Sequence, residues 1–230
     1  MPVRGGAMAK LAHLLRQLDA HRLPVHITPV ARMMVEPMTD ALRGASRLIL
    51  KQLLNPALTD IVLNVLGKQG RTFDPLFHNT VSPTMLHGSD KVNVIPAEVS
   101  VELDGRLLPG QQPEDIIAEL RRIAGDDVEF EVLRYEPGPP EPDMHLFETL
   151  SGILREADPG GIPIPLLLSG VTDARNFTKL GIQTYGFQPM TLPPDFNFAQ
   201  TVHAADERIP VDAVNFGAQA IYTLLQRFGG

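Results

Sequence analysis

The sequence contains no cysteine and no tryptophan among its 230 residues. Without cysteine the chain has no disulfide bonds, thiolate nucleophiles or thiolate metal ligands, and histidine and carboxylate side chains are the strong metal ligands that remain. The absence of disulfide bonds is compatible with the reducing cytoplasm, which is the location that we expect.

Long apolar runs and basic clusters are also missing. No stretch approaches the roughly 20 apolar residues of a membrane-spanning helix, so we expect no membrane partner. The 27 acidic residues outnumber the 20 basic ones, and the basic residues form no block. A nucleic acid is therefore not expected as a partner, and a small polar or amino-acid-derived ligand suits the charge balance better.

The composition supports a packed core, since 43% of the residues are hydrophobic. The segment 137–142 is rich in proline, and such a stiff, polar segment is typical of a domain boundary. We therefore predict two domains, at residues 1–138 and 139–230.

The first domain alternates between helical and strand patterns. Apolar residues at three- and four-residue spacing predict helices, and alternating apolar and polar residues predict strands. Their order is that of a ferredoxin-like split βαβ unit that lacks its first strand, with a helical insertion at about 37–70. The expected elements are helices at 5–20 and within 37–70, strands at 81–86 and 97–108, a helix from Pro113 and a strand at 128–133.

The pattern of the second domain favours an α/β layer. Short apolar runs at 162–168 and 184–188 suit strands, and helices are expected at 146–154, after Thr172 and from Pro210. The predicted fold class is thus α/β, with an α+β first domain and an α/β second one. In the last helix, four residues are expected to face the core: Val214, Ala218, Ile221 and Leu225.

The motif Asp104-Gly105-Arg106 lies on the charged face of the strand expected at 97–108. As a surface charge pair it needs no further role, because most charged strand faces are solvated. Alternatively, the planar guanidinium of Arg106 offers a fork that binds a substrate carboxylate, which a lysine could not match.

Two turns in the second domain carry further candidates. Thr172 and Asp173 are natural N-cap residues, and capping alone explains them. Arg175 follows in the first turn, where a cation opposes the helix dipole, so it forms either a salt bridge or a substrate contact. His203 stands ahead of a pair of carboxylates, and by itself a histidine there is an ordinary packed or capping residue.

Four strings together form a recognisable pattern: Asn93-Val94-Ile95-Pro96, Asp104-Gly105-Arg106, Gly170-Val171-Thr172-Asp173-Ala174-Arg175 and His203-Ala204-Ala205-Asp206-Glu207. They resemble the co-catalytic zinc peptidases and deacylases, which include acetylornithine deacetylase, succinyl-diaminopimelate desuccinylase, aminoacylase and glutamate carboxypeptidase. The resemblance covers nearly the whole chain but only the C-terminal half of a family member. It implies that 1–138 is a lid and dimerisation domain, truncated at its N-terminus, and that 139–230 is the C-terminal part of a catalytic domain.

The resemblance implies roles for the residues of these strings. Asn93 and Arg106 would bind substrate from the lid. Gly170, Thr172 and Arg175 would lie beside the active site, with Arg175 near the substrate. The implied substrate is a small molecule with a free carboxylate, and the implied assembly is a homodimer formed through the lid.

His203 matches the last zinc-binding histidine of the family. The implied cofactor is zinc, with two ions in the complete protein, and other divalent metals such as cobalt are possible in their place. A single imidazole cannot hold a zinc ion, because a catalytic zinc needs three protein ligands. The other ligands and the general base of the family cannot be placed in this sequence.

The implied reaction is hydrolysis of the amide bond of N-acyl amino acids or small peptides. Because most ligands and the general base are missing, we expect the chain to be inactive by itself and the native gene product to be longer. Whether the chain is an enzyme therefore stays open. The alternative is a non-catalytic module that dimerises or binds amino-acid-like ligands.

Overall fold

A computed structural model describes the chain at residues 4–125, 128–138, 142–168 and 170–228. The chain forms two units, which consist of Met1–Glu141 with Leu166–Val171 (unit 1) and Pro142–Pro165 with Thr172–Gly230 (unit 2). The assignment of 1–138 as a lid and of 139–230 as part of a catalytic domain remains a prediction.

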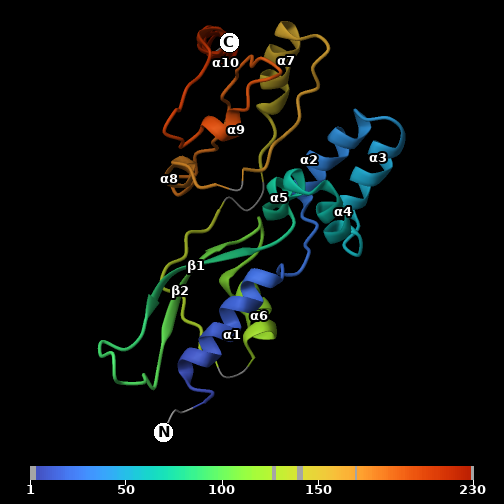
Figure 1. Ribbon diagram of the computed structural model, residues 1–230. Helices are drawn as coiled ribbons and strands as arrows, with labels where there is room; N and C mark the ends of the chain where they lie inside the picture. Colours follow the sequence, from blue (N-terminus) through green and yellow to red (C-terminus); the bar gives the residue numbers. More distant parts are fainter. Residues whose placement is uncertain (1–3, 126–127, 139–141, 169, 229–230) are drawn as a thin grey trace. The chain divides into compact units, whose positions relative to one another are not determined.

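Unit 1 combines helices with a two-stranded antiparallel sheet, so its fold is α+β as the sequence predicts (Figure 1). The helices between the first helix and the first strand form the expected insertion, which begins earlier than predicted. The elements are α1 (Ala7–Ala20), α2 (Pro29–Asp40), α3 (Gly44–Lys51), the 3₁₀ turn η1 (Gln52–Leu54), α4 (Thr59–Leu66), α5 (Lys68–Phe73), the 3₁₀ turn η2 (Asp74–Leu76), β1 (Thr80–His87), β2 (Ser100–Arg106) and α6 (Pro113–Ala124).

The core of unit 1 lies between the sheet and the two helices α1 and α6. β1 and β2 pair from Thr80 opposite Arg106 to His87 opposite Ser100. Side chains from both strands and both helices surround one apolar cluster, so the two helices cover the same face of the sheet. The cluster contains Leu23, Ile116 and Leu120, and the side chains packed against it are Leu18, Val81, Leu103, Leu107, Ile123 and Phe130.

Local sequence signals explain where the helices of unit 1 begin. Thr28 caps α2, because its hydroxyl accepts a hydrogen bond of 3.1 Å from the amide of Ala31. In α6, Gln112 and Asp115 form a capping box, and Pro113 occupies the first turn, where its missing N–H is not needed. Gly125 ends α6 with a positive φ of 75°, a conformation that favours glycine.

The strand expected at 128–133 does not form, which corrects the prediction. A strand needs a neighbour to satisfy its backbone groups, and within the described residues the sheet contains β1 and β2 alone. Phe130 still packs against the apolar cluster, whereas Val132 and Leu133 are exposed. The alternating apolar pattern at 128–133 therefore predicts correctly that Phe130 faces the core, although the segment is not a strand.

Unit 2 is built on the contact between two helices. Its elements are α7 (Phe147–Ala157), α8 (Ala174–Thr178), α9 (Phe198–Thr201) and α10 (Val211–Phe228). α7 packs against α10, and an ion pair of 2.7 Å between Arg227 and Glu156 joins them. A Cβ at Gly217 would lie 2.9 Å from the carbonyl oxygen of Pro189, so the chain approaches α10 too closely for any other residue.

Two predictions for the second half are wrong. The runs 162–168 and 184–188 form no strands, because no described segment pairs with them. The prediction of which face of α10 packs is also wrong. The packed face contains the buried residues Ala213 and Ala220. The four residues expected to face the core are all exposed: Val214, Ala218, Ile221 and Leu225.

No helix in the described part of the chain has both the length and the apolar character needed to cross a membrane.

Candidate functional site

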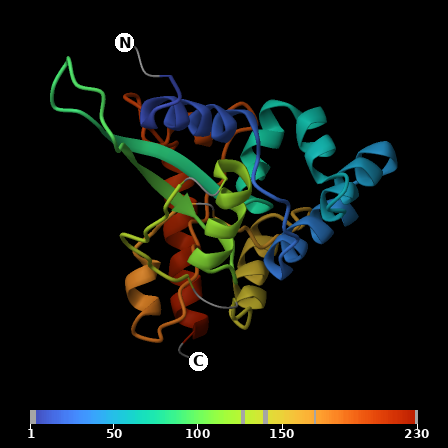
Figure 2. The same cartoon turned by 90° about the horizontal axis from the view of Figure 1, so that it is seen from below.

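The structure places the two lid candidates at opposite ends of the sheet. Asn93 lies in the exposed loop that follows His87, and this loop projects away from α1 and α6 in two views (Figures 1 and 2). Arg106 is the last residue of β2, six residues beyond Ser100. At about 3.4 Å per residue, the ladder between them is roughly 20 Å long. Within one copy of unit 1, these two side chains therefore do not share a site.

Arg106 pairs with Asp104, the other charged residue of its motif. Its Nε and Nη2 donate hydrogen bonds of 3.4 and 3.3 Å to Asp104 Oδ2. Both side chains are half exposed, so the pair is screened by water. This geometry is compatible with both interpretations of the motif.

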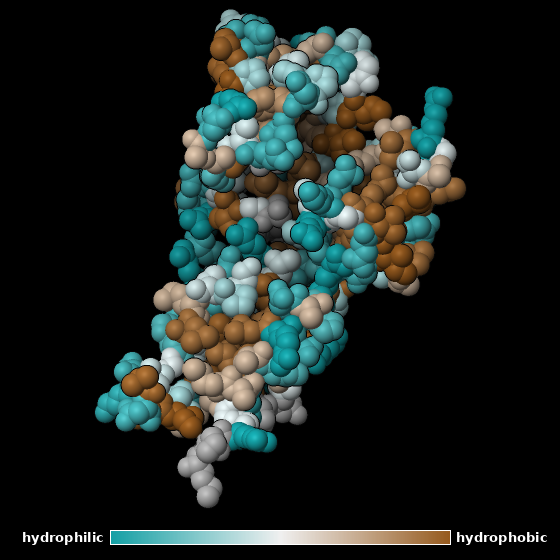
Figure 3. Space-filling view, in the orientation of Figure 1, coloured by the Kyte–Doolittle hydropathy of each residue, from teal (hydrophilic) through white to brown (hydrophobic). Residues whose placement is uncertain are grey.

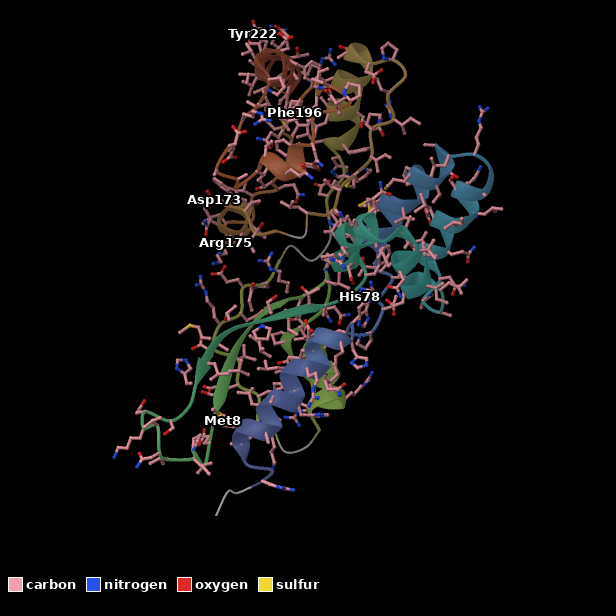
Figure 4. The ribbon with its side chains drawn as sticks, viewed as in Figure 1. Met8, His78, Asp173, Arg175, Phe196 and Tyr222 are labelled. Atoms are coloured by element: carbon pink, nitrogen blue, oxygen red, sulfur yellow. The ribbon has the colours of Figure 1, made fainter. Side chains whose placement is uncertain are left out.

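In the turn before α8, Thr172 makes the capping hydrogen bonds that its sequence predicts. The Thr172 hydroxyl accepts a hydrogen bond of 3.3 Å from the amide of Ala174, and the amide of Arg175 donates to the Thr172 carbonyl at 3.3 Å. Asp173 and Arg175 both lie at this short helix (Figure 4). Gly170 is exposed and belongs to unit 1 rather than unit 2.

His203 has an unusual backbone conformation. It lies in an exposed turn after α9, and its φ of 60° is in the region that residues other than glycine rarely adopt. Among the described residues it is the one non-glycine residue with a positive φ. Such positions occur most often at turns and functional sites, because the local structure has to hold them there.

A surface pocket of about 290 Å³ lies in the same stretch of unit 2. Asp206 at its rim forms an ion pair with Arg208, so the pocket is polar and partly neutralised. His203 does not line it. The lining residues are Asp195, Phe196, Asn197, Gln200, Thr201, Ala204, Asp206 and Arg208.

The described residues do not bring together a complete metal centre. Within the ranges that the structure describes, no group of three or more histidine, aspartate or glutamate side chains is placed to hold a metal ion. His203 therefore remains a single candidate ligand, and no catalytic step through a metal can be derived from this chain.

A buried polar network in unit 1 was not predicted from the sequence. His78, with a side chain 1% exposed, directs Nδ1 to the Asp74 carboxylate at 2.7 Å. Arg22 donates from Nε to the other oxygen of Asp74 at 2.7 Å, and its Nη1 reaches Asn64 at 2.8 Å and Asp60 at 3.3 Å. Figure 4 shows His78 beside the helices of the insertion. The network joins the segment after α1 to the insertion and to the start of the sheet.

The network shifts the titration of its members. Burial alone would raise the pKa of Asp74, but hydrogen bonds from His78 and Arg22 outweigh it and hold the pKa below its ordinary value. Burial alone would lower the pKa of His78, but its hydrogen bond to Asp74 and the nearby Asp60 charge raise it. His78 Nε2 lies 3.2 Å from Asp60 Oδ1 without forming a hydrogen bond, so that contact is electrostatic.

A second polar group lies next to this network. Glu119 of α6 is 5% exposed and faces His26 Nε2 at 2.5 Å. Its other oxygen accepts a hydrogen bond of 3.2 Å from Asn79 Nδ2, and Asn79 Oδ1 accepts one of 2.9 Å from the backbone amide of Leu108. These bonds satisfy buried groups and connect α6 to the end of the sheet where β1 begins and β2 ends, so their evident role is structural.

One part of the polar network had a signal in the sequence. Asp74 and His78 are four residues apart, which is the spacing at which side chains meet on a helical turn. Arg22 and Asp60 are far from that pair in the sequence and become its neighbours only through the fold. No local pattern could have found them.

Comparison with known proteins assigns the chain to a family. Residues 2–130 match the family described as "Peptidase dimerisation domain". The match covers more than half of the chain, so the chain belongs to this family, which is part of the M20 peptidases. No solved structure matches the chain.

Curated relatives point to the same group of enzymes. The chain is 27% identical over 184 residues to the human N-fatty-acyl-amino acid synthase/hydrolase PM20D1, covering 76% of this chain and 36% of that protein. It is 28% identical over 220 residues to the Bos taurus protein of the same name, covering 86% and 42%. It is 28% identical over 144 residues to the probable carboxypeptidase S-like 2 of Dictyostelium discoideum, covering 61% and 27%. The chain thus spans less than half the length of each of these relatives.

Proposed function

We propose that this chain supplies the lid and the C-terminal part of the catalytic domain of a metal-dependent amidohydrolase that cleaves N-acyl amino acids or small peptides. The observation that carries this proposal is the match of residues 2–130 to the peptidase dimerisation domain. It is supported by relatives that are named as an N-fatty-acyl-amino acid synthase/hydrolase and a carboxypeptidase S-like protein. The proposed substrates share an amide bond and a free carboxylate.

The proposed site residues have separate tasks. Arg106 binds the substrate carboxylate through its planar guanidinium, which Asp104 steadies. Asn93 offers an amide that hydrogen-bonds substrate from the loop between the strands. Because it lies at the other end of the sheet from Arg106, it would do so in the site of a second copy. Gly170, Thr172 and Arg175 line the substrate side of the turn before α8.

Zinc, as two ions, is the proposed cofactor, and cobalt or another divalent ion is the alternative. Histidine and carboxylates are the ligands available to a chain without cysteine. Because His203 is the single candidate ligand proposed here, we propose that the isolated chain neither retains zinc nor hydrolyses substrate.

A second role, dimerisation, is favoured by the same family match. We propose the cytoplasm as its location, since a chain without cysteine needs no oxidising compartment. Within the described residues β1 and β2 pair only with each other, so each strand has an open edge. Open edges pair readily with another chain. We propose that two copies associate through unit 1, and that a purely dimerising or amino-acid-binding module is the alternative to a part of an enzyme.

Metal content and turnover test the enzymatic proposal. The purified chain is incubated with zinc, dialysed, and assayed for bound zinc and for hydrolysis of an N-acetyl and an N-palmitoyl amino acid. We expect no stoichiometric zinc and no turnover. Stoichiometric zinc together with turnover that His203→Ala abolishes and His145→Ala leaves intact would contradict the proposal, because the chain would then carry its own catalytic centre. His145 is a suitable control because it is exposed and lies in the same unit.

A further inference from the structure

Two helices of the insertion present apolar side chains to solvent. No residue of α3 is buried, and Leu48 and Ile49 are 66% and 43% exposed. On α4, Ile61 and Val65 are 56% and 71% exposed, whereas Val62 and Leu63 on its other side are buried. Figure 3 shows hydrophobic atoms gathered over these helices. An exposed apolar patch of this kind marks an interaction surface.

Basic side chains border the patch. Arg47 and Lys51 are four residues apart on α3 and therefore lie on one side of it, next to Leu48. Arg43 is the extended residue just before the helix, and these three residues form a basic stripe. Arg47 forms an ion pair of 2.7 Å with Asp40. In the described part of the chain no ion pair involves Arg43 or Lys51. The stripe is positive although the whole chain has a formal net charge of −7.

We propose that α3 and α4 dock on the surface of an anionic lipid bilayer. A helix that combines an apolar face with Lys and Arg on its flank lies in the interface of a membrane, with its apolar side chains at the acyl boundary and its cations at the phosphates. Leu48 and Ile49 enter the interface, and Arg43, Arg47 and Lys51 contact the anionic headgroups. The net negative charge of the remaining surface orients the chain, since the bilayer repels it elsewhere.

The charges decide between a bilayer and a second copy of the chain. Two copies meeting through this patch would bring two basic stripes together, and like charges at an interface are unfavourable. An anionic surface complements the stripe instead. Surface docking is separate from membrane spanning, and the expectation that there is no membrane partner was based on the lack of a spanning helix alone. The proposal does not depend on the hydrolase function.

Vesicle co-sedimentation tests the proposal. The wild-type chain is mixed with vesicles of phosphatidylglycerol and phosphatidylcholine or with vesicles of phosphatidylcholine alone. We expect binding to the anionic vesicles and little binding to the neutral ones. Binding to the anionic vesicles should fall when salt is raised from about 0.05 to about 0.5 M, because salt screens the headgroup charge.

Three variants separate the apolar and electrostatic contributions. Leu48→Gln should weaken binding by about tenfold, since it removes an apolar side chain from the interface. Replacing Arg43 and Lys51 by Gln should weaken it by about fivefold for each charge. Leu225→Gln is the matched control, because Leu225 is also 66% exposed but lies on α10 in unit 2. It should bind like the wild type.

Several outcomes would overturn the proposal. They are absence of binding to anionic vesicles, equal binding to neutral vesicles, or an equal loss of binding in Leu48→Gln and Leu225→Gln. Self-association of the free chain that Leu48→Gln abolishes would assign the patch to a second copy instead. All four substituted positions are exposed, so the variants should fold. If one variant does not fold, the binding of the wild-type chain and its salt dependence still test the proposal.

Discussion

At the scale of single residues, the best-defined chemistry in the structure is the buried contact of His78 with Asp74. None of its members is a residue that the motifs singled out, and it joins two neighbours that are distant in sequence, Arg22 and Asp60. This charged network surrounds the buried His78 and links the insertion to the start of the sheet, although its other members are partly exposed. Removing Asp74 or His78 is costly, because a partly buried charge then loses its partner.

The network predicts how stability depends on pH. The raised pKa of His78 means that its contribution is fully present below its unfolded pKa of about 6.5 and is lost as pH rises through the folded value. The lowered pKa of Asp74 means that its contribution is present above about 3.9 and is lost as pH falls. The pair therefore contributes most between these limits.

Urea unfolding of His78→Gln across this pH range tests the prediction. The variant should lose about 1–3 kcal/mol near pH 6, and this loss should shrink as pH rises through the raised pKa of His78. His87→Gln is the control, because His87 faces Glu102 at 3.1 Å on the exposed surface. A pH-independent loss in His78→Gln would show that the histidine contributes by packing alone.

Arg106 carries the prediction about substrate. In the active enzyme to which we assign this chain, Arg106→Lys should lower kcat/KM for an N-acyl amino acid by roughly tenfold, since a charge-assisted bidentate pair is lost. The same variant should lose much less on the substrate amide. Arg134→Lys is a matched control, because Arg134 also pairs with a carboxylate two residues away. If the ratio of kcat/KM for the acid to kcat/KM for the amide is the same in Arg106→Lys and in the wild type, Arg106 is only a surface charge.

At the scale of elements, apolar periodicity predicted the helices and strands whose signals lie within their own sequence. The helices α1 and α6 and the strands β1 and β2 follow from apolar spacing and from turn residues near each end, and the structure confirms them. The expected strands at 128–133, 162–168 and 184–188 do not form, because a strand depends on a neighbour that its own sequence does not specify.

The packed face of α10 shows a second limit of sequence reasoning. Val214 and Leu225 form a regular apolar stripe that is exposed, whereas the buried face contains small residues such as Ala213 and Ala220. Small residues permit the close approach of Pro189 at Gly217. Periodicity identifies both stripes but cannot say which one meets a neighbour. The same limit applies to the candidate site. Its residues were identified from sequence motifs, but only the fold shows how far apart Asn93 and Arg106 lie.

The core between α6 and the sheet gives a prediction at this scale. Leu120→Ala should destabilise the chain by about 2–5 kcal/mol, because it leaves a cavity in the apolar cluster. Leu86→Ala on β1 removes the same atoms from an exposed position and should cost far less. Chemical denaturation of both variants measures the difference. Equal losses would mean that the cluster does not support the fold.

At the scale of the whole molecule, the family and the coverage of relatives are the established facts. The chain's family is defined by a dimerisation domain, and the chain spans less than half of its relatives. The open edges of β1 and β2 and the exposed apolar stripe of α10 are surfaces that further polypeptide could cover. Association is therefore the property on which the proposed function depends most.

The mass of the chain in solution tests this claim most directly. Light scattering coupled to size-exclusion chromatography should give twice the chain mass of 25.2 kDa at concentrations above the micromolar range. A charged substitution at an exposed position of the β1 edge, Thr84→Lys, should shift the mass toward one chain, because a lysine on an edge strand opposes pairing. A strict monomer at every concentration up to the solubility limit would contradict the account.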